Sequence, residues 1–171
     1  MEQRKIKPKQ MLCFFLCTIL LIGIDQASKQ AAQQMLRGRA AFPMIPGVFE
    51  LLYLENRGSA FGLMQGQKAL FLTMAAIMLF LIPYIYTKIP MTRRFLYLRV
   101  IAVLFLSGAV GNAIDRMMNG YVIDFFYFSL IDFPIFNVAD IYVTVSTILL
   151  IVLMLFYYKD EDFDQIHLFS R

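Results

Sequence analysis

Two aspartates of this sequence lie among apolar residues, where a carboxylate needs an explanation. Asp124 stands in the segment Val-Ile-Asp-Phe-Phe, and Asp140 stands immediately before a long uncharged run. A buried carboxylate without a partner is strongly destabilising, so both side chains are expected to have a purpose. Two carboxylates brought together would share one proton, as they do in acid proteases. One could then take a proton from water while the other gives a proton to the scissile amide.

Asp140 also has a purely structural interpretation. If Asn137 caps a helix, Asp140 occupies the third helical position, where a carboxylate favours the positive end of the helix dipole. Asp124 has no comparable explanation. Both interpretations of Asp140, a helix cap and a catalytic group, stay open from these residues alone.

Other hydrolytic chemistries lack suitable residues near these aspartates. The single histidine is His167, at the far C-terminal end, and the two cysteines, Cys13 and Cys17, lie in the first apolar run. A Ser-His or Cys-His pair is therefore excluded beside the aspartates, and the sequence holds no metal-ligand cluster. If the protein is an enzyme, these two carboxylates carry out its chemistry, and no metal or other cofactor is expected.

The elements that position these aspartates are predicted to be membrane helices. The chain has 171 residues, of which 60% are apolar and 16% are charged, whereas a soluble domain is about 45–50% apolar and about 25% charged. A globule of this size could not bury so much apolar surface. Four stretches without charge follow one another along the chain, at residues 11–24, 69–87, 100–114 and 141–158.

A membrane-spanning helix needs about 20 residues, so the two shorter stretches must extend into their flanking turns. We therefore predict a membrane all-α fold with four transmembrane helices in a single integral-membrane domain, residues 1–171. The approximate spans are 10–30, 67–87, 97–116 and 138–158.

Lysine and arginine are unevenly distributed among the connections, and this predicts the orientation. The termini and the middle connection (1–10, 88–99 and 159–171) hold ten of these residues, whereas the two longer connections (25–68 and 115–140) hold six. By the positive-inside rule, both termini are cytoplasmic and both aspartates lie at the extracytoplasmic face. The bias also explains the basic isoelectric point without nucleic acid as a partner. The acidic residues at 160–164 are expected in a solvated cytoplasmic tail.

The two outer connections carry strand and turn signals. Residues 41–63 combine β-forming residues with the turn pair Pro46-Gly47, which predicts a small extracytoplasmic β-element. Asn119-Gly120 predicts a tight turn before the apolar strand that holds Asp124.

Further polar residues gather at the outer ends of the predicted spans. Asp25 and Lys29 are four residues apart on one helix face, in the order that favours an ion pair, although interfacial anchoring alone could explain them. In the third span Gly108, Asn112 and Arg116 recur every four residues. Close helix packing could explain Gly108, but it explains Arg116 less well.

Five segments in order along the chain give these residues a wider context. They are Asp25-Gln-Ala-Ser-Lys29, Glu55-Asn-Arg-Gly-Ser-Ala-Phe-Gly62, Gly108-Ala-Val-Gly-Asn-Ala-Ile-Asp-Arg116, Val122-Ile-Asp-Phe125 and Phe133-Pro-Ile-Phe-Asn-Val-Ala-Asp140. With them the chain resembles the lipoprotein signal peptidase (signal peptidase II) family, bacterial membrane aspartyl proteases that remove signal peptides from lipidated prolipoproteins.

The resemblance implies a function and a set of site residues. Asp124 and Asp140 would be the catalytic dyad, and the residues that order the site and hold the substrate would be Asp25, Lys29, Asn56, Gly108, Asn112, Arg116 and Asn137. The enzyme would lie in the bacterial cytoplasmic membrane and cut just before a cysteine that carries a diacylglyceryl group. It also implies four spans, a small extracytoplasmic β-element and a short interfacial helix. Membrane lipid is an expected partner, and nothing in the chain demands an oligomer.

Two departures and two other functions accompany this resemblance. Ser107 stands where the family often has glycine, and the link between the two aspartates is short for the family. A small four-helix proton or solute transporter could use the same ionisable residues, but the predicted charges stop at one face. A non-enzymatic assembly subunit would leave Asp124 without a purpose. Within the dyad, we expect Asp140 to be the resting base and Asp124 the protonated acid.

Overall fold

Four long helices dominate the computed structural model, which describes residues 8–58 and 67–166. They are α1 (Pro8–Leu36), α2 (Lys68–Lys88), α3 (Leu96–Met118) and α4 (Val138–Phe156). Each is long and apolar enough to cross a membrane, with a mean hydropathy between 1.7 and 2.3. The predicted fold class is thereby confirmed. The first helix continues past residue 30 as far as Leu36.

The third helix lies at the centre of the bundle, where α1, α2 and α4 all pack against it. Two glycines allow this close approach. A Cβ atom added at Gly108 would lie 2.5 Å from the carbonyl oxygen of Ala139 in α4, and one at Gly111 would lie 2.6 Å from Oδ2 of Asp25 in α1. The backbone of α3 can approach α4 and the Asp25 side chain this closely only because neither position carries a side chain of its own. Gly108 therefore has the packing role that its spacing allowed.

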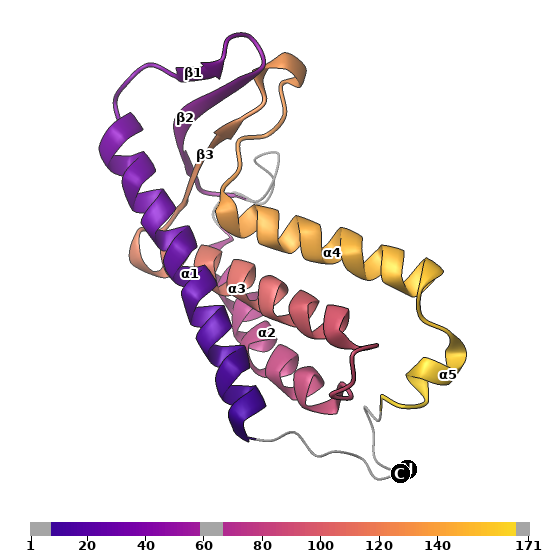
Figure 1. Cartoon of the computed structure of the whole chain (residues 1–171). Helices are drawn as coiled ribbons and strands as arrows, with labels where there is room; N and C mark the ends of the chain where they lie inside the picture. Colours follow the sequence, from indigo (N-terminus) through magenta and orange to yellow (C-terminus); the bar gives the residue numbers. More distant parts are fainter. Residues whose placement is uncertain (1–7, 59–66, 167–171) are drawn as a thin grey trace.

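A small antiparallel sheet covers one end of the bundle (Figure 1). Its strands are β1 (Phe42–Ile45), β2 (Phe49–Asn56) and β3 (Val122–Tyr127), in that order across the sheet. The β1–β2 hairpin is the predicted β-element as far as it is described, since residues 59–63 of the predicted 41–63 lie outside the described part.

The second outer connection supplies the third strand and one short helix. The predicted turn at Asn119-Gly120 leads into β3, which pairs with β2 in register Leu54 to Asp124. Gly120 has a φ of 81°, a conformation that glycine adopts without strain. Beyond β3 lies the 3-10 helix η2 (Ser129–Ile131), which is the one helix that the described residues of the two outer connections contain.

At the opposite end of the bundle, one expectation from the sequence is wrong. The short helix α5 (Asp160–Phe163) lies there (Figure 1). The Asp162 carboxylate receives hydrogen bonds from Nε and Nη2 of Arg94, at 2.5 and 2.6 Å, and the residue is buried. Asp162 was expected in a solvated tail and is instead docked against the α2–α3 connection. The charge run gave no indication of a partner that lies 68 residues away.

Candidate active site

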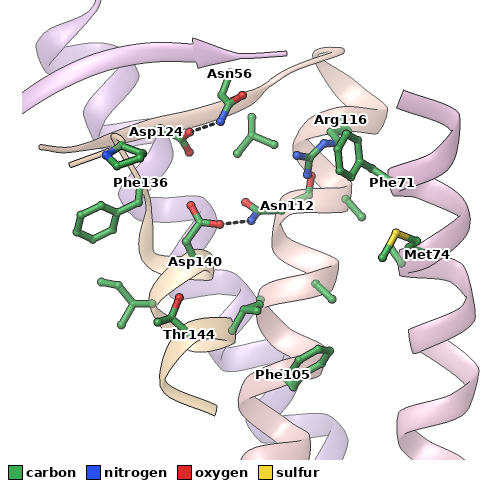
Figure 2. Close-up of a pocket in the computed structure, with 18 of the residues that line it drawn as sticks. Asn56, Phe71, Met74, Phe105, Asn112, Arg116, Asp124, Phe136, Asp140 and Thr144 are labelled. Atoms are coloured by element: carbon green, nitrogen blue, oxygen red, sulfur yellow. Dashed lines mark hydrogen bonds between the residues drawn. The ribbon is translucent and has the colours of Figure 1, made fainter. Parts of the chain in front are cut away.

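Asp124 and Asp140 line the same cavity at the sheet-covered end of the bundle (Figure 2). Asp124 is the third residue of β3, and Asp140 is the third residue of α4. The cavity has a volume of about 620 Å³. The walls are formed by α2, α3, α4 and the segment that joins β3 to α4. A strand from the outer sheet and the start of a membrane helix therefore bring the two carboxylates together.

Asn137 connects the two aspartates through one residue. Its Oδ1 accepts a hydrogen bond from the backbone N–H of Asp140 (3.0 Å), while its own backbone N–H donates to Oδ2 of Asp140 (3.1 Å). Its side-chain Nδ2 donates to Oδ1 of Asp124 at 2.6 Å. Asn137 and Asp140 thus form the capping box that the structural interpretation predicts. The same contacts also hold Asp140 beside Asp124, so the cap and the site coincide.

Asn112 fixes the remaining oxygen of Asp140. Its Oδ1 accepts hydrogen bonds from the ammonium group of Lys29 (2.9 Å) and from Nδ2 of Asn137 (3.1 Å). An ammonium group can only donate, so the amide must turn its Nδ2 in the other direction. That Nδ2 donates to Oδ1 of Asp140 at 2.8 Å (Figure 2).

Asp124 is held by two asparagines and is almost inaccessible to solvent. Asn56 of β2 donates from Nδ2 to Oδ2 of Asp124 at 2.8 Å (Figure 2). Asn137 donates to the other oxygen, Oδ1. Burial and, to a smaller extent, the negative charge of Asp140 raise the pKa of Asp124 to about 7, against the opposing hydrogen bonds and the Lys29 charge. Asp124 therefore holds a proton more readily than an ordinary aspartate, whose pKa is about 3.9.

Arg116 supplies a positive charge to the cavity wall without binding either aspartate directly. Its guanidinium group donates to the carbonyl oxygen of Gly58 at 2.9 Å and lies 4.3 Å from the centre of the Phe71 ring. This contact joins α3 to α2 on the side of the cavity that faces Asp124 and Asp140 (Figure 2).

The other predicted residues divide into those that line the cavity and those behind it. Asn56, Gly108, Asn112 and Arg116 contribute to the lining, whereas Asp25, Lys29 and Asn137 do not. Lys29 forms ion pairs with Asp25 (2.9 Å) and Asp115 (3.0 Å) and is 2% exposed. The predicted ion pair within α1 is thus present, but it lies in the protein interior.

Sequence reasoning missed Asp115 and Gln26, which complete this buried group. Nε2 of Gln26 donates to Oδ1 of Asp115 (3.0 Å) and to Oδ2 of Asp25 (3.2 Å). A usable signal existed, because Asp115 follows Gly111 by four residues and so lies on the helix face that approaches α1. The apolar wall from α2, which includes Met74 and Met78, was also not predicted. In the described ranges 8–58 and 67–166, no group of three or more His, Cys, Asp or Glu side chains could hold a metal ion.

Comparison with known proteins identifies the family. The family model described as "Signal peptidase (SPase) II" matches residues 17–156. The chain belongs to the signal peptidase II family. It is 39% identical to the lipoprotein signal peptidase of Clostridioides difficile (strain 630), over 85% of this chain and 97% of that protein. It is 36% identical to that of Streptococcus pyogenes serotype M5 (strain Manfredo), over 88% and 95%.

Solved structures agree with this assignment. A bacterial membrane enzyme determined by the in meso method at 2.3 Å resolution superimposes with a TM-score of 0.75, 28% identity and coverage of 91% of this chain and 93% of that one. A second, at 1.9 Å resolution, gives 0.73 and 27%, with coverage of 92% and 100%. As a signal peptidase II, the chain is an aspartic endopeptidase and a multi-pass bacterial membrane protein.

Proposed function

We propose that this chain cuts diacylglyceryl-modified prolipoproteins immediately before the lipidated cysteine, with Asp124 and Asp140 as the catalytic dyad. The dyad is supported by the hydrogen bonds of Asn137, which donates to one oxygen of Asp140 and to one oxygen of Asp124 beside the same cavity. No other pair of carboxylates lines this cavity among the described residues. Family membership supports the substrate class.

The two aspartates have environments suited to different roles. Asp140 lies in the first turn of α4, where the positive end of the helix dipole favours the charged carboxylate. Asp140 is therefore placed as the acceptor that takes a proton from water. Asp124, whose pKa is raised to about 7 by burial, carries the proton that the leaving amine requires.

The reaction then balances between these two groups. Asp140 removes a proton from water while the oxygen of that water bonds to the scissile carbonyl carbon. Asp124 donates its proton to the amide nitrogen, and the C–N bond breaks. The signal peptide leaves with a new carboxyl group, and the cysteine keeps a free amine. A proton passes from Asp140 to Asp124 to restore the resting dyad.

The cavity wall suits a substrate that approaches through the bilayer. Besides the polar residues near the dyad, the lining is apolar and includes Phe71, Met74 and Met78 of α2, Phe105 of α3 and Val145 of α4. Flexible methionine side chains accommodate apolar helices of different sequence. A signal-peptide helix between α2 and α4 would carry its cleavage site up to the carboxylates.

The proposed orientation places the dyad at the extracytoplasmic face and both termini in the cytoplasm. The argument is the lysine and arginine bias of the connections, together with a sheet and a dyad at the same end of the helices. Lipid would then hold the substrate cysteine at the depth of the carboxylates. We propose that the enzyme acts as a monomer, because one chain supplies the complete set of contacts around both aspartates.

The test is cleavage of a diacylglyceryl-modified prolipoprotein in liposomes by wild type, Asp124→Asn and Asp140→Asn. We expect wild-type cleavage and a loss of about 10³-fold or more in each variant. Asp132→Asn is the matched control and should leave the rate unchanged, because Asp132 lies in the same connection and its side chain accepts a hydrogen bond from Tyr127, away from the cavity. A folded dyad variant that cuts at the wild-type rate would refute the dyad, and an inactive wild type would refute the substrate.

A further inference from the structure

The Asp25 side chain bonds the backbone of Ala139, the residue that precedes Asp140 in the chain. Its Oδ1 accepts a hydrogen bond from the backbone N–H of Ala139 at 2.9 Å. Asp25 comes from α1 and has no exposed surface. The contact reaches across to the first turn of α4, where Gly111 of α3 leaves the necessary space beside the carboxylate.

Asp115 makes the equivalent contact with Ile123, the residue that precedes Asp124 in the chain. Its Oδ2 accepts a hydrogen bond from the backbone N–H of Ile123 at 3.1 Å. Its Oδ1 accepts the bond from Gln26, so both oxygens are engaged. Each of two buried carboxylates thus fixes the residue that immediately precedes one member of the dyad.

Lys29 joins the two carboxylates. Its Nζ lies 2.9 Å from Oδ2 of Asp25, 3.0 Å from Oδ2 of Asp115 and 2.9 Å from Oδ1 of Asn112. An ammonium group has three N–H bonds, and each has one acceptor here. The third acceptor is the amide that bonds Asp140. The Lys29 side chain therefore contacts Asp25, Asp115 and Asn112 together.

Stability alone does not explain this arrangement. Three charges with side chains 0–3% exposed lose their hydration, and apolar residues of the same volume are often at least as stable as such a buried group. A shared cation between two carboxylates does, however, fix the distance between them, and each carboxylate is bonded to one half of the dyad.

We propose that Asp25 and Asp115, held together by Lys29, are positioning residues that set the separation and orientation of Asp140 and Asp124. The inference rests on the proposed dyad and adds Asp115 to its supporting residues. Asp25 and Asp115 do not line the cavity, so they act through the backbone and not by touching substrate.

Amide hydrogen exchange in micelles tests the two contacts separately. Asp115→Ala removes the acceptor for Ile123, so exchange at the Ile123 amide should accelerate about tenfold, with little change at Ala139. Asp25→Ala should give the reverse pattern. Asp115→Asn keeps an acceptor oxygen and should preserve protection at Ile123. Equal acceleration at both amides in both alanine variants, or none in either, would overturn the proposal.

Kinetics provide a second test, which compares the alanine variant of Asp115 with the conservative asparagine variant. Because a displacement of about 1 Å can cost about 10²-fold in rate, Asp115→Ala should lower kcat by about that factor and leave KM within about twofold. Asp115→Asn should recover most of the rate. Asp162→Asn, which removes a carboxylate from the ion pair at the opposite end, is the matched control and should leave kcat unchanged. A KM effect without a kcat effect would contradict positioning.

The pH profile separates positioning from a loss of folded protein. The charged groups around Asp124 are Asp140 of α4, Lys29 of α1 and Arg116 of α3. Behind them lie Asp25 and Asp115, and the side chain that β2 presents to Asp124 is the neutral Asn56.

Asp115→Ala frees the backbone before Asp124, which changes the burial and hydrogen bonds that set the pKa of Asp124, so the alkaline limb of kcat should shift. A loss of folded protein would instead lower kcat by the same factor at every pH and leave the limb in place, and that result would overturn the proposal while the dyad stands. An inactive wild type would instead refute the proposed function, and the exchange experiment would still decide the contacts.

Discussion

The two ends of the helical bundle use ion pairs in different ways. Near the sheet, Lys29 is 2% exposed and lies between two carboxylates that are 0% and 3% exposed. At the other end, the Arg94 side chain is 41% exposed and pairs with Asp162. The first group joins α1 and α3 and continues to β3 and α4 through backbone hydrogen bonds. The second fastens one short helix, α5.

This difference shows where charged side chains are buried despite the loss of their hydration. Buried charges are retained near Asp124 and Asp140, where Asp25 and Asp115 bond the residues that precede these carboxylates and Lys29 bonds Asn112. The Arg94 pair keeps contact with water and is reinforced by neighbours, because the Tyr158 hydroxyl donates to the carbonyl oxygen of Arg94 and its ring stacks on Phe95. Because the Arg94 side chain remains in contact with water, its pairing with the buried Asp162 is screened and contributes little to stability, so this ion pair mainly holds α5 in place.

The largest expected effect comes from removing Lys29. Lys29→Met leaves Asp25 and Asp115 buried without their cation, which should lower the free energy of unfolding by about 3–5 kcal/mol. The matched variant is Arg94→Met, which removes a cation from the exposed pair and should lower it clearly less. Unfolding of both variants by SDS titration in mixed micelles measures the difference. Equal losses would remove the distinction between the two ends.

The two ends should also respond to pH in opposite directions. Burial raises the pKa of Asp124 to about 7, so its contribution to stability is complete below its unfolded pKa of about 3.9 and is lost as pH rises through 7. The hydrogen bonds from Arg94 and from the backbone of Lys159 lower the pKa of Asp162 to about 2. Its contribution is complete above about 3.9 and is lost as pH falls towards 2.

Unfolding midpoints between pH 2 and pH 8 measure these two contributions. Asp124→Asn should flatten the profile on the neutral side only, and Asp162→Asn should flatten it on the acid side only. The comparison would fail if either variant changed the opposite limb.

The smallest expected effect is that of Asp162→Asn at neutral pH. The variant loses the bidentate contact with Arg94, so α5 should detach more often while the four long helices remain in place. Limited proteolysis should cut near residues 160–163 faster than in wild type, with cleavage of prolipoprotein unchanged. A loss of peptidase activity would show that α5 is coupled to the dyad.

Much of the fold could be predicted because its signals are local. Four uncharged stretches predict four helices, since lipid accepts only apolar side chains over such lengths. The Asn137–Asp140 capping box and the Asp25–Lys29 pair each lie within one helical turn. Their geometry follows from the 3.6-residue period of the helix, so sequence reasoning identified them without a structure.

By itself the sequence determined the helices, the two aspartates and the polar residues near them. Only the tertiary structure decided which partners those residues have. Lys29 meets Asn112 across 83 positions of the chain, and Ala139 meets Asp25 across 114. Such contacts depend on how the helices pack around Gly108 and Gly111. The physical reason is that periodicity reports which face of a helix is apolar, whereas a buried charge is satisfied by whichever group the packed neighbour brings to it.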